Sequence, residues 1–203
     1  MTVKLAISAC RIGVALLVML MLTQTAPAQA KSILSASHET KIGQCIRQAA
    51  AGHEWLERTL WGLRDQEGGW IGAEILNTDG SYDLGPMQVN SWWVGRISKV
   101  LRHSGSDVRH WLIHDACFNV RAARWIFLSG LAVTGDYWQA VGAYHSPTKW
   151  RQQRYGTNVA GKLIKRFGSD LFEREYAKLQ VNRKANCHNN LKIGQNNSNM
   201  DTR

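Results

Sequence analysis

The apolar residues between positions 42 and 65 recur at helical spacing, and this pattern runs on to an acidic residue. Leu56, Leu60 and Leu63 share one face of the helix predicted over 42–65, and Glu67 continues that face seven residues beyond Leu60. A carboxyl group on an apolar face is expected to be shielded from water. Burial raises the pKa of a carboxylic acid, so that it can hold and donate a proton near neutral pH. Glu67 is therefore the candidate general acid.

The segment that follows Glu67 carries groups that suit the binding of a sugar. Gly68 and Gly69 have no side chains to crowd the approach to the acid, and Trp70 offers a flat apolar face. Gln88 is predicted on the first turn of the next helix, where its amide would form hydrogen bonds. The pattern indicates a site for a carbohydrate beside Glu67.

The rest of the chain predicts a mainly α fold. Periodicity indicates further helices near residues 88–101, 116–129, 136–144 and 159–167. The turn signal Asn-Thr-Asp-Gly at 77–80 predicts a small hairpin or an irregular loop close to the candidate acid. The sequence contains no strand series, internal repeat or glycine-rich phosphate loop.

Three sequence elements occur in an order that is typical of a known enzyme family. They are Glu67 at a helix end, Gly-Pro-Met-Gln-Val-Asn at 85–90 and Val-Gly-Ala-Tyr-His at 141–145. Together they resemble the lytic transglycosylases with a soluble-transglycosylase (SLT) domain, and most of all the small single-domain members associated with conjugation and secretion machinery. The resemblance covers roughly residues 43–168 and implies a lysozyme-like helical domain.

The resemblance also implies a reaction. Such enzymes cleave the peptidoglycan glycan between N-acetylmuramic acid (MurNAc) and N-acetylglucosamine (GlcNAc). Glu67 would donate a proton to the glycosidic oxygen and then, as a carboxylate, accept the proton of the C6 hydroxyl that attacks C1, leaving a 1,6-anhydro end. The residues that would contact the substrate or orient the acid are Trp70, Met87, Gln88, Asn90 and Tyr144. No metal and no organic cofactor is implied.

Three positions depart from the pattern of this family. The family usually has Ser-Gly after its catalytic glutamate, whereas Gly68 follows Glu67 here. Pro86 replaces the leucine of Gly-Leu-Met-Gln, and His145 replaces the asparagine of Ala-Tyr-Asn. A hydroxyl that could bond the acid is therefore missing, and other groups are expected to orient it.

The cysteines bear on stability and compartment. Cys45 and Cys117 flank the candidate site, and in an oxidising compartment a disulfide would tie the helix carrying Glu67 to the helix beginning near Ala116. Such a loop is worth roughly 4 kcal/mol in the chain-entropy model. Two buried free thiols are the alternative, but the same pair occurs in small members of the family. Cys187 remains as an extra thiol in a polar tail.

The first thirty residues have the layout of a cleaved signal peptide. Lys4 and Arg11 accompany an apolar run over 12–22, and Ala-Pro-Ala-Gln-Ala at 26–30 predicts cleavage after Ala30. This run is much shorter than the roughly 20 residues that a membrane-spanning helix needs. We therefore expect a periplasmic protein without stable membrane insertion. Its predicted parts are a signal at 1–30, a polar leader at 31–42, the catalytic domain at 43–179 and a polar, disordered tail at 180–203.

The net charge would attract an anionic partner, although a solvated basic surface with no particular partner fits it equally well. Removal of the signal leaves 23 basic and 15 acidic residues, a net charge of +8. Peptidoglycan carries peptide carboxylates, although nucleic acid and anionic lipid would also be attracted to a positively charged protein. No recognised nucleic-acid-binding module accompanies the charge. Peptidoglycan strands, and components of a secretion or conjugation apparatus, are the expected partners.

Other candidate groups are weaker. The remaining carboxylates near Glu67 are Asp65, Glu74, Asp79 and Asp83. Asp65 would be turned about 200° from the apolar stripe, and Asp79 suits its turn, whereas a second catalytic carboxylate in the loop stays open. The spacing of His110, His114 and Cys117 resembles a metal site, but Asp115-Ala116 predicts a helix start that breaks their common face.

Three other functions fit the same sequence. A hydrolytic muramidase would share the fold and Glu67 but would use water as the nucleophile. A non-catalytic glycan-binding protein would keep the groove without the chemistry. A structural component of an envelope-spanning apparatus would use the basic surface to meet its partners.

Overall fold

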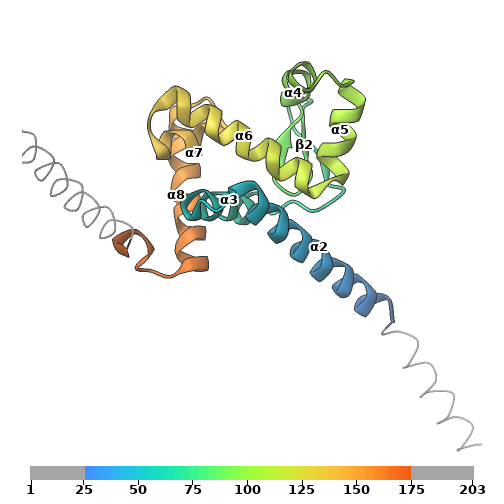
Figure 1. Cartoon of the computed structure of the whole chain (residues 1–203), viewed down its shortest axis with the longest axis horizontal. Helices are drawn as coiled ribbons and strands as arrows, with labels where there is room; N and C mark the ends of the chain where they lie inside the picture. The colour runs from blue at the N-terminus through green and yellow to red at the C-terminus, as the bar shows by residue number, and fades with distance from the viewer. Residues whose placement is uncertain (1–25, 175–203) are drawn as a thin grey trace, which may run out of the picture. The chain divides into compact units, whose positions relative to one another are not determined.

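A computed structural model describes residues 26–174 of the chain, in two compact units (Figure 1). Unit 1 comprises the residues up to Gly52 together with Gly69–Ala122, and unit 2 comprises His53–Gly68 together with the residues from Ala123 onward. Most of the predicted signal peptide, the tail beyond residue 180 and Cys187 lie outside the described residues. The predicted leader at 31–42 and the predicted cleavage position after Ala30 fall within the first helix, α2 (Ala26–Ala50).

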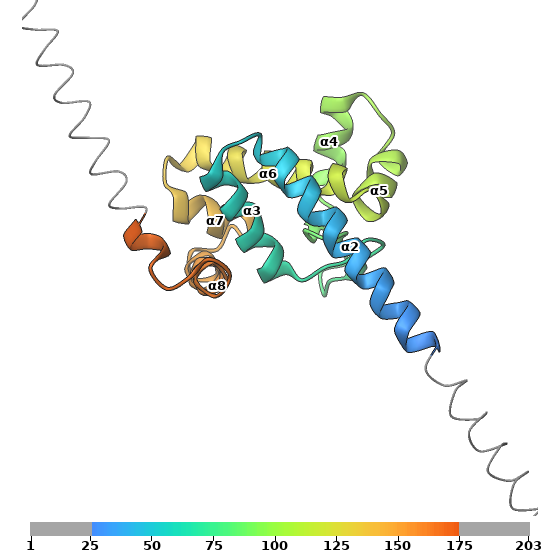
Figure 2. The ribbon, with the colours of Figure 1, turned by 60° about the horizontal axis from the view of Figure 1, so that its bottom comes forward.

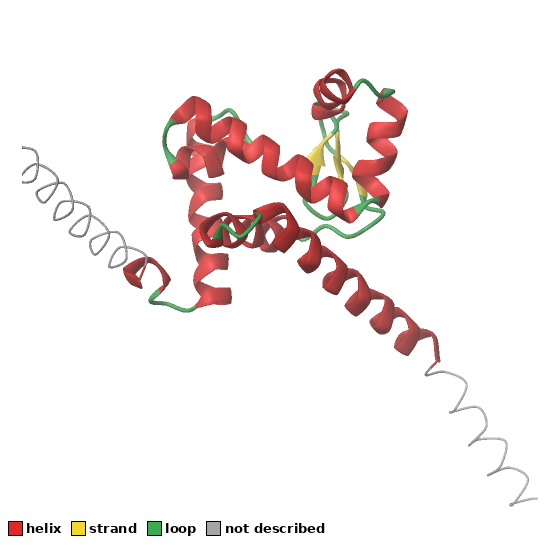
Figure 3. Ribbon diagram, viewed as in Figure 1, coloured by secondary structure: helices red, strands yellow, loops and turns green. Residues whose placement is uncertain are grey.

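The described residues form a mainly helical fold with one small antiparallel sheet, as expected for a lysozyme-like domain (Figure 3). Unit 1 contains α2, β1 (Glu74–Leu76), β2 (Tyr82–Leu84), β3 (Val89–Asn90), α4 (Trp93–Leu101) and α5 (Gly105–His114). Unit 2 contains α3 (Glu54–Glu67), α7 (Tyr137–His145) and α8 (Lys149–Phe167). One helix, α6 (Ala116–Thr134), begins in unit 1 and continues into unit 2. No helix within residues 26–174 combines the length and the hydropathy needed to cross a membrane.

The single helix predicted over 42–65 is wrong, because the chain breaks it into α2 and α3. Ala51 and Gly52 adopt positive φ angles of 51° and 82°, which a continuing α-helix does not permit. His53 then has an extended backbone and is exposed. The apolar spacing stays in phase across this break, so periodicity alone did not reveal it.

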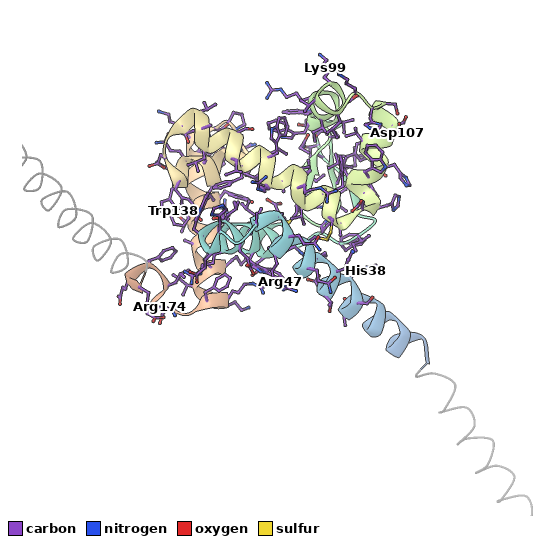
Figure 4. The ribbon with its side chains drawn as sticks, viewed as in Figure 1. His38, Arg47, Lys99, Asp107, Trp138 and Arg174 are labelled. Atoms are coloured by element: carbon purple, nitrogen blue, oxygen red, sulfur yellow. A yellow bond between two sulfur atoms is a disulfide. The ribbon has the colours of Figure 1, made fainter. Side chains whose placement is uncertain are left out.

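The disulfide belongs to unit 1. Cys45 on α2 and Cys117 on α6 are bonded, with their Cα atoms 4.7 Å apart (Figure 4). The expectation that Cys45 shares a helix with Glu67 is wrong, since Glu67 ends α3. A disulfide indicates an oxidising compartment outside the cytoplasm.

The sheet of unit 1 contains the predicted hairpin. Strands β1 and β2 pair antiparallel, with Leu76 opposite Tyr82, across a turn in which Gly80 has a φ of 80°. The order of the strands is β1-β2-β3. The third strand replaces what was predicted as the start of a helix at residue 88, and the helix α4 begins only at Trp93.

One helix was not predicted, and others differ from their predicted extent, among them α6, which runs to Thr134 and not to residue 129. Helix α5 was not predicted, although Ser104 caps it by accepting a hydrogen bond from the backbone N–H of Asp107 at 3.1 Å. Helix α8 starts at Lys149, ten residues before the predicted start at Val159. The segments of α5 and α8 are rich in polar residues, which hid their helical periodicity.

Unit 2 packs α3 and α7 against α8 (Figure 2). The predicted core residues Leu56, Leu60 and Leu63 of α3 are buried. Two glycines allow the close approach of the helices. A Cβ atom at Gly62 would lie 2.9 Å from the side chain of Leu163, and one at Gly142 would lie 2.7 Å from the Cα of Gln152.

Candidate active site

Glu67 is the last residue of α3, and the backbone ends the helix at that point. Gly68 adopts the left-handed conformation, with a φ of 63°, and its N–H bonds the carbonyl of Arg64 at 3.0 Å. A Cβ atom at Gly68 would meet no other atom within 4 Å, so the glycine serves the backbone turn and not a tight contact. The Glu67 side chain is half-buried.

The carboxylate of Glu67 accepts a hydrogen bond from the hydroxyl of Tyr155 on α8. Tyr155 is only 4% exposed. Burial raises the pKa of Tyr155 well above its usual range, and the neighbouring groups Glu67 and Tyr144 raise it further. The phenol therefore stays protonated and acts as a fixed donor to Oε1 of Glu67.

Tyr155 was not among the residues predicted from the sequence, which included Tyr144 as a residue that would contact the substrate or orient the acid. Tyr144 lies near the end of α7, close enough to Tyr155 to affect its pKa. His145, the next residue, stacks on the ring of Tyr155 with centroids 4.8 Å apart and planes 5° from parallel. The spacing of Tyr155, Val159 and Leu163, four residues apart, is a sequence signal that could have placed Tyr155 on the buried face of α8, but it does not indicate the contact with Glu67.

An ion pair fastens the end of α3 to α8. Asp65 receives two hydrogen bonds of 2.6 Å from the guanidinium of Arg166, and Arg166 also lies 4.0 Å from the ring centroid of Trp61. Asp65 is thereby occupied as a structural partner. This contact and the glycine contacts of α8 hold the helix that carries Tyr155 against the helix that carries Glu67.

In unit 1, the segment 85–88 forms a turn that a buried amide holds in place. Asn119 of α6 is fully buried, and its Oδ1 accepts the N–H of Met87 at 2.8 Å. Its Nδ2 donates to the carbonyls of Leu84 and Leu112 at 2.8 and 2.9 Å. Gly85 has a φ of 67° and no space for a side chain, because a Cβ atom would strike Asn119. The Gly-x-Met-Gln string is thus a turn that requires glycine.

Two of the predicted substrate contacts lie in this turn. Met87 is fully buried. Gln88 adopts a φ of 48° before β3, and its Nε2 donates to the carbonyl of Gly85 at 2.8 Å. The prediction that Gln88 starts a helix is therefore wrong.

The other two predicted substrate contacts in unit 1 are Asn90, which is half-buried, and Trp70, which is exposed. Asn90 donates to Ser81 at 2.9 Å and to Asp83 at 3.1 Å, and its Oδ1 accepts the N–H of Trp92. Its amide therefore braces the strands. Trp70 is 54% exposed, which leaves a large part of its indole open to a ligand.

Comparisons with known proteins identify the relatives of this chain, although no protein-family model matches it. Invasion protein IagB of Salmonella typhimurium is 30% identical over 128 residues, which are 63% of this chain and 77% of the relative. Protein IpgF of Shigella sonnei is 30% identical over 124 residues, or 61% of this chain and 78% of the relative. The chain belongs to the IagB/IpgF family. This assignment confirms the resemblance to small, secretion-associated proteins of the lytic transglycosylase type.

In this member of the IagB/IpgF family, the other acidic residues near Glu67 in the sequence have structural partners. Glu74 forms an ion pair with Arg109. Hydrogen bonds from the hydroxyl and the backbone N–H of Ser81 hold the pKa of Asp79 below its ordinary value, as its predicted turn role requires. Asp83 accepts a hydrogen bond from Asn90.

His110 and His114, whose spacing with Cys117 resembles a metal site, lie on α5. The rings of His110 and His114 are 4.7 Å apart, and Cys117 is occupied by its disulfide. Across residues 26–174, no group of three or more potential metal-ligating side chains comes together.

Proposed function

We propose that this protein is a peptidoglycan lytic transglycosylase, which cleaves the bond between MurNAc and GlcNAc and forms 1,6-anhydro-MurNAc ends. The observation that carries this proposal is the hydrogen bond from Tyr155 to Glu67. It gives one half-buried carboxyl group, at the end of a helix, a fixed orientation. Membership of the IagB/IpgF family supports the same reaction.

In this proposal the two oxygens of Glu67 have different tasks. Oε1 accepts the hydrogen bond of Tyr155, and Oε2 would carry the acidic proton and deliver it to the glycosidic oxygen. After the bond breaks, Glu67 is a carboxylate, and the hydrogen bond of the phenol stabilises that charge. The carboxylate then takes the proton of the MurNAc C6 hydroxyl as that oxygen attacks C1. The leaving sugar gains one proton, and Glu67 recovers the one it gave.

This mechanism needs one carboxyl group and no catalytic water. Tyr155 takes the place of the hydroxyl that the family usually supplies directly after its glutamate. The partners of Glu74, Asp79 and Asp83 support a structural role for these carboxylates.

The remaining site residues have three different roles in the proposal. Trp70 and Gln88 would contact the sugars directly, Trp70 through its exposed face. Met87 and Asn90 would act through the turn and strands that they hold in place. Tyr144 would act on the acid through Tyr155.

The proposed setting is local remodelling of the cell wall by an envelope-spanning secretion or conjugation apparatus. The relative IagB is named an invasion protein. The disulfide of unit 1 supports a periplasmic location. Peptidoglycan strands would be the substrate.

Mass spectrometry of digested peptidoglycan tests the proposal. Purified sacculi incubated with the wild-type protein should release muropeptides lighter by one water than the products of hydrolysis. Products of the hydrolysed mass would make the protein a muramidase. An absence of any product would leave a glycan-binding or structural role.

A further inference from the structure

A cavity of about 320 Å³ adjoins the proposed acid in unit 2. Its lining residues come from the end of α3, the end of α7 and the first half of α8, and they are Gln66, His145, Trp150, Arg151, Arg154, Tyr155 and Asn158. Tyr155 is shared, because it lines this cavity and also donates to Glu67. We call this feature the arginine cavity.

The arginine cavity carries two positive charges that have no carboxylate partner among the described residues. Arg151 lies 5.3 Å from the ring centroid of Trp150 and Arg154 is exposed, and neither forms an ion pair within residues 26–174. By contrast, Arg58, Arg109 and Arg166 each pair with an acidic side chain. Arg151 and Arg154 are three residues apart on α8, which places them on neighbouring positions of one helix face.

The chemistry of this lining selects an anion with a planar, oxygen-rich group. A guanidinium binds a carboxylate through two parallel hydrogen bonds, and the two arginines line one cavity. The amides of Gln66 and Asn158 add neutral donors, and Trp150, 59% exposed, adds an apolar face. These groups suit a short acidic peptide better than a neutral sugar.

We propose that the arginine cavity binds a carboxylate of the peptide that branches from MurNAc. This inference rests on the proposed function, because it uses the shared residue Tyr155 to place the cavity beside the acid that cleaves the glycan. Within a peptide-bearing strand, the carboxylates belong to the branch and not to the sugars. The protein therefore recognises strands that carry peptides, and the bound branch fixes which MurNAc unit lies at Glu67.

The test measures binding and not cleavage, so that it does not depend on turnover. The Glu67→Gln variant is sedimented with purified sacculi, and with sacculi whose carboxylates have been converted to amides by carbodiimide and ammonia. The sugars and the peptide chains are the same in both. The same measurement is made with Arg151→Gln and Arg154→Gln added, and with Lys162→Gln and Lys165→Gln added as a control. The control removes two positive charges from the same helix outside the arginine cavity.

The expected result is selective. Loss of the two arginines should weaken binding to native sacculi about tenfold, the size of a charge-assisted contact, and leave binding to amidated sacculi unchanged. The lysine control should change binding to native sacculi by less than about twofold, since exposed charges away from the site act weakly. Circular dichroism and the melting temperature should match among all variants.

Three results would overturn the inference. One is unchanged binding of the arginine variant to native sacculi, and another is an equal loss on native and amidated sacculi. The third is an equal loss in the lysine control, which would indicate attraction by net charge alone. Failure of the proposed function is recognised separately, because it shows as an absence of anhydro products from the wild-type protein.

Discussion

Unit 1 and unit 2 are each stabilised internally by a different kind of contact. In unit 1, a disulfide joins α2 to α6, and the buried amide of Asn119 bonds three backbone groups around the turn at 85–88. In unit 2, the described contacts are noncovalent, and they rely on helices that approach closely at Gly62 and Gly142. The candidate acid and its hydrogen-bond donor both belong to unit 2.

This difference predicts which substitutions in each unit affect stability and which affect the orientation of Glu67. The polar turn of unit 1 is fixed by bonds to its own backbone, so that changes to surface side chains should leave it intact. The orientation of Glu67 depends on α8, since Tyr155 is 88 residues away in the sequence. A change in helix packing in unit 2 should therefore reach the chemistry, whereas a change in unit 1 should first affect stability.

The largest expected effect is the loss of the disulfide. Replacing Cys45 and Cys117 together by serine should lower the free energy of unfolding by about 4 kcal/mol, because the bond closes a loop across a long stretch of chain. Chemical denaturation measures this difference. A reducing agent should destabilise the wild-type protein by a similar amount and leave the double variant unchanged. Equal stability of both proteins under oxidising conditions would contradict the role of the bond.

The next effect comes from the helix contact in unit 2. Gly142→Ala should cost about 3 kcal/mol, because the new Cβ atom would lie 2.7 Å from the Cα and 2.8 Å from the carbonyl oxygen of Gln152, and backbone atoms cannot turn aside. Gly161→Ala is the matched control, since a Cβ atom there meets nothing within 4 Å. The control should gain about 0.5–1 kcal/mol from helix propensity. Thermal unfolding measures the stability of Gly142→Ala and Gly161→Ala. A loss of stability of the same size in both variants would refute the packing argument.

Loss of the buried amide of Asn119 in unit 1 should have the third-largest effect on stability. Asn119→Ala leaves the N–H of Met87 and the carbonyls of Leu84 and Leu112 without their partner, at a cost of about 2–3 kcal/mol. Arg121→Ala, at an exposed position of the same helix, should stay within about 0.5 kcal/mol of the wild type. Urea denaturation compares them. A stability of Asn119→Ala equal to that of the control would show that the turn does not need the amide.

The smallest effect on stability is expected for two tyrosines of unit 2, the buried Tyr155 and the half-buried Tyr137. Tyr155→Phe and Tyr137→Phe each remove one hydrogen bond, to Glu67 and to Thr59 respectively, and each should cost about 1 kcal/mol. Only Tyr155→Phe should slow the release of anhydro products, by about tenfold or more, since it removes a donor aimed at the reacting carboxylate. Initial rates on sacculi measure the difference. Equal rates for the two variants would mean that the phenol of Tyr155 does not orient the acid.

The sequence predicted what depends on short-range patterns. The apolar face of Leu56, Leu60 and Leu63 located the helix that ends at Glu67, and the turn signal at 77–80 located the hairpin. The break between α2 and α3 escaped, because two left-handed residues fit into the spacing without disturbing its phase.

The environment of the acid could not be predicted in the same way. Tyr155 lies in a polar part of α8, and its role arises from a contact with a helix 88 residues earlier. Gln88 was placed on a helix because its left-handed backbone has no signature in that residue type. Gly142 is part of the motif that indicated the family, and the structure gives its physical reason, the contact with α8.

The central claim is that one carboxyl group, held by Tyr155, performs the chemistry. Its most direct test compares Glu67→Gln with Asp65→Asn, two neutralised acids on the last turn of one helix. Anhydro-product formation should fall about a thousandfold in Glu67→Gln. It should stay within about twofold of the wild type in Asp65→Asn, which loses the charge of a partly exposed ion pair but keeps an oxygen that can accept a hydrogen bond from Arg166, while the contact of Gly62 with Leu163 still holds α8 against α3. Retention of wild-type turnover by Glu67→Gln, or an equal loss in both variants, would contradict the account.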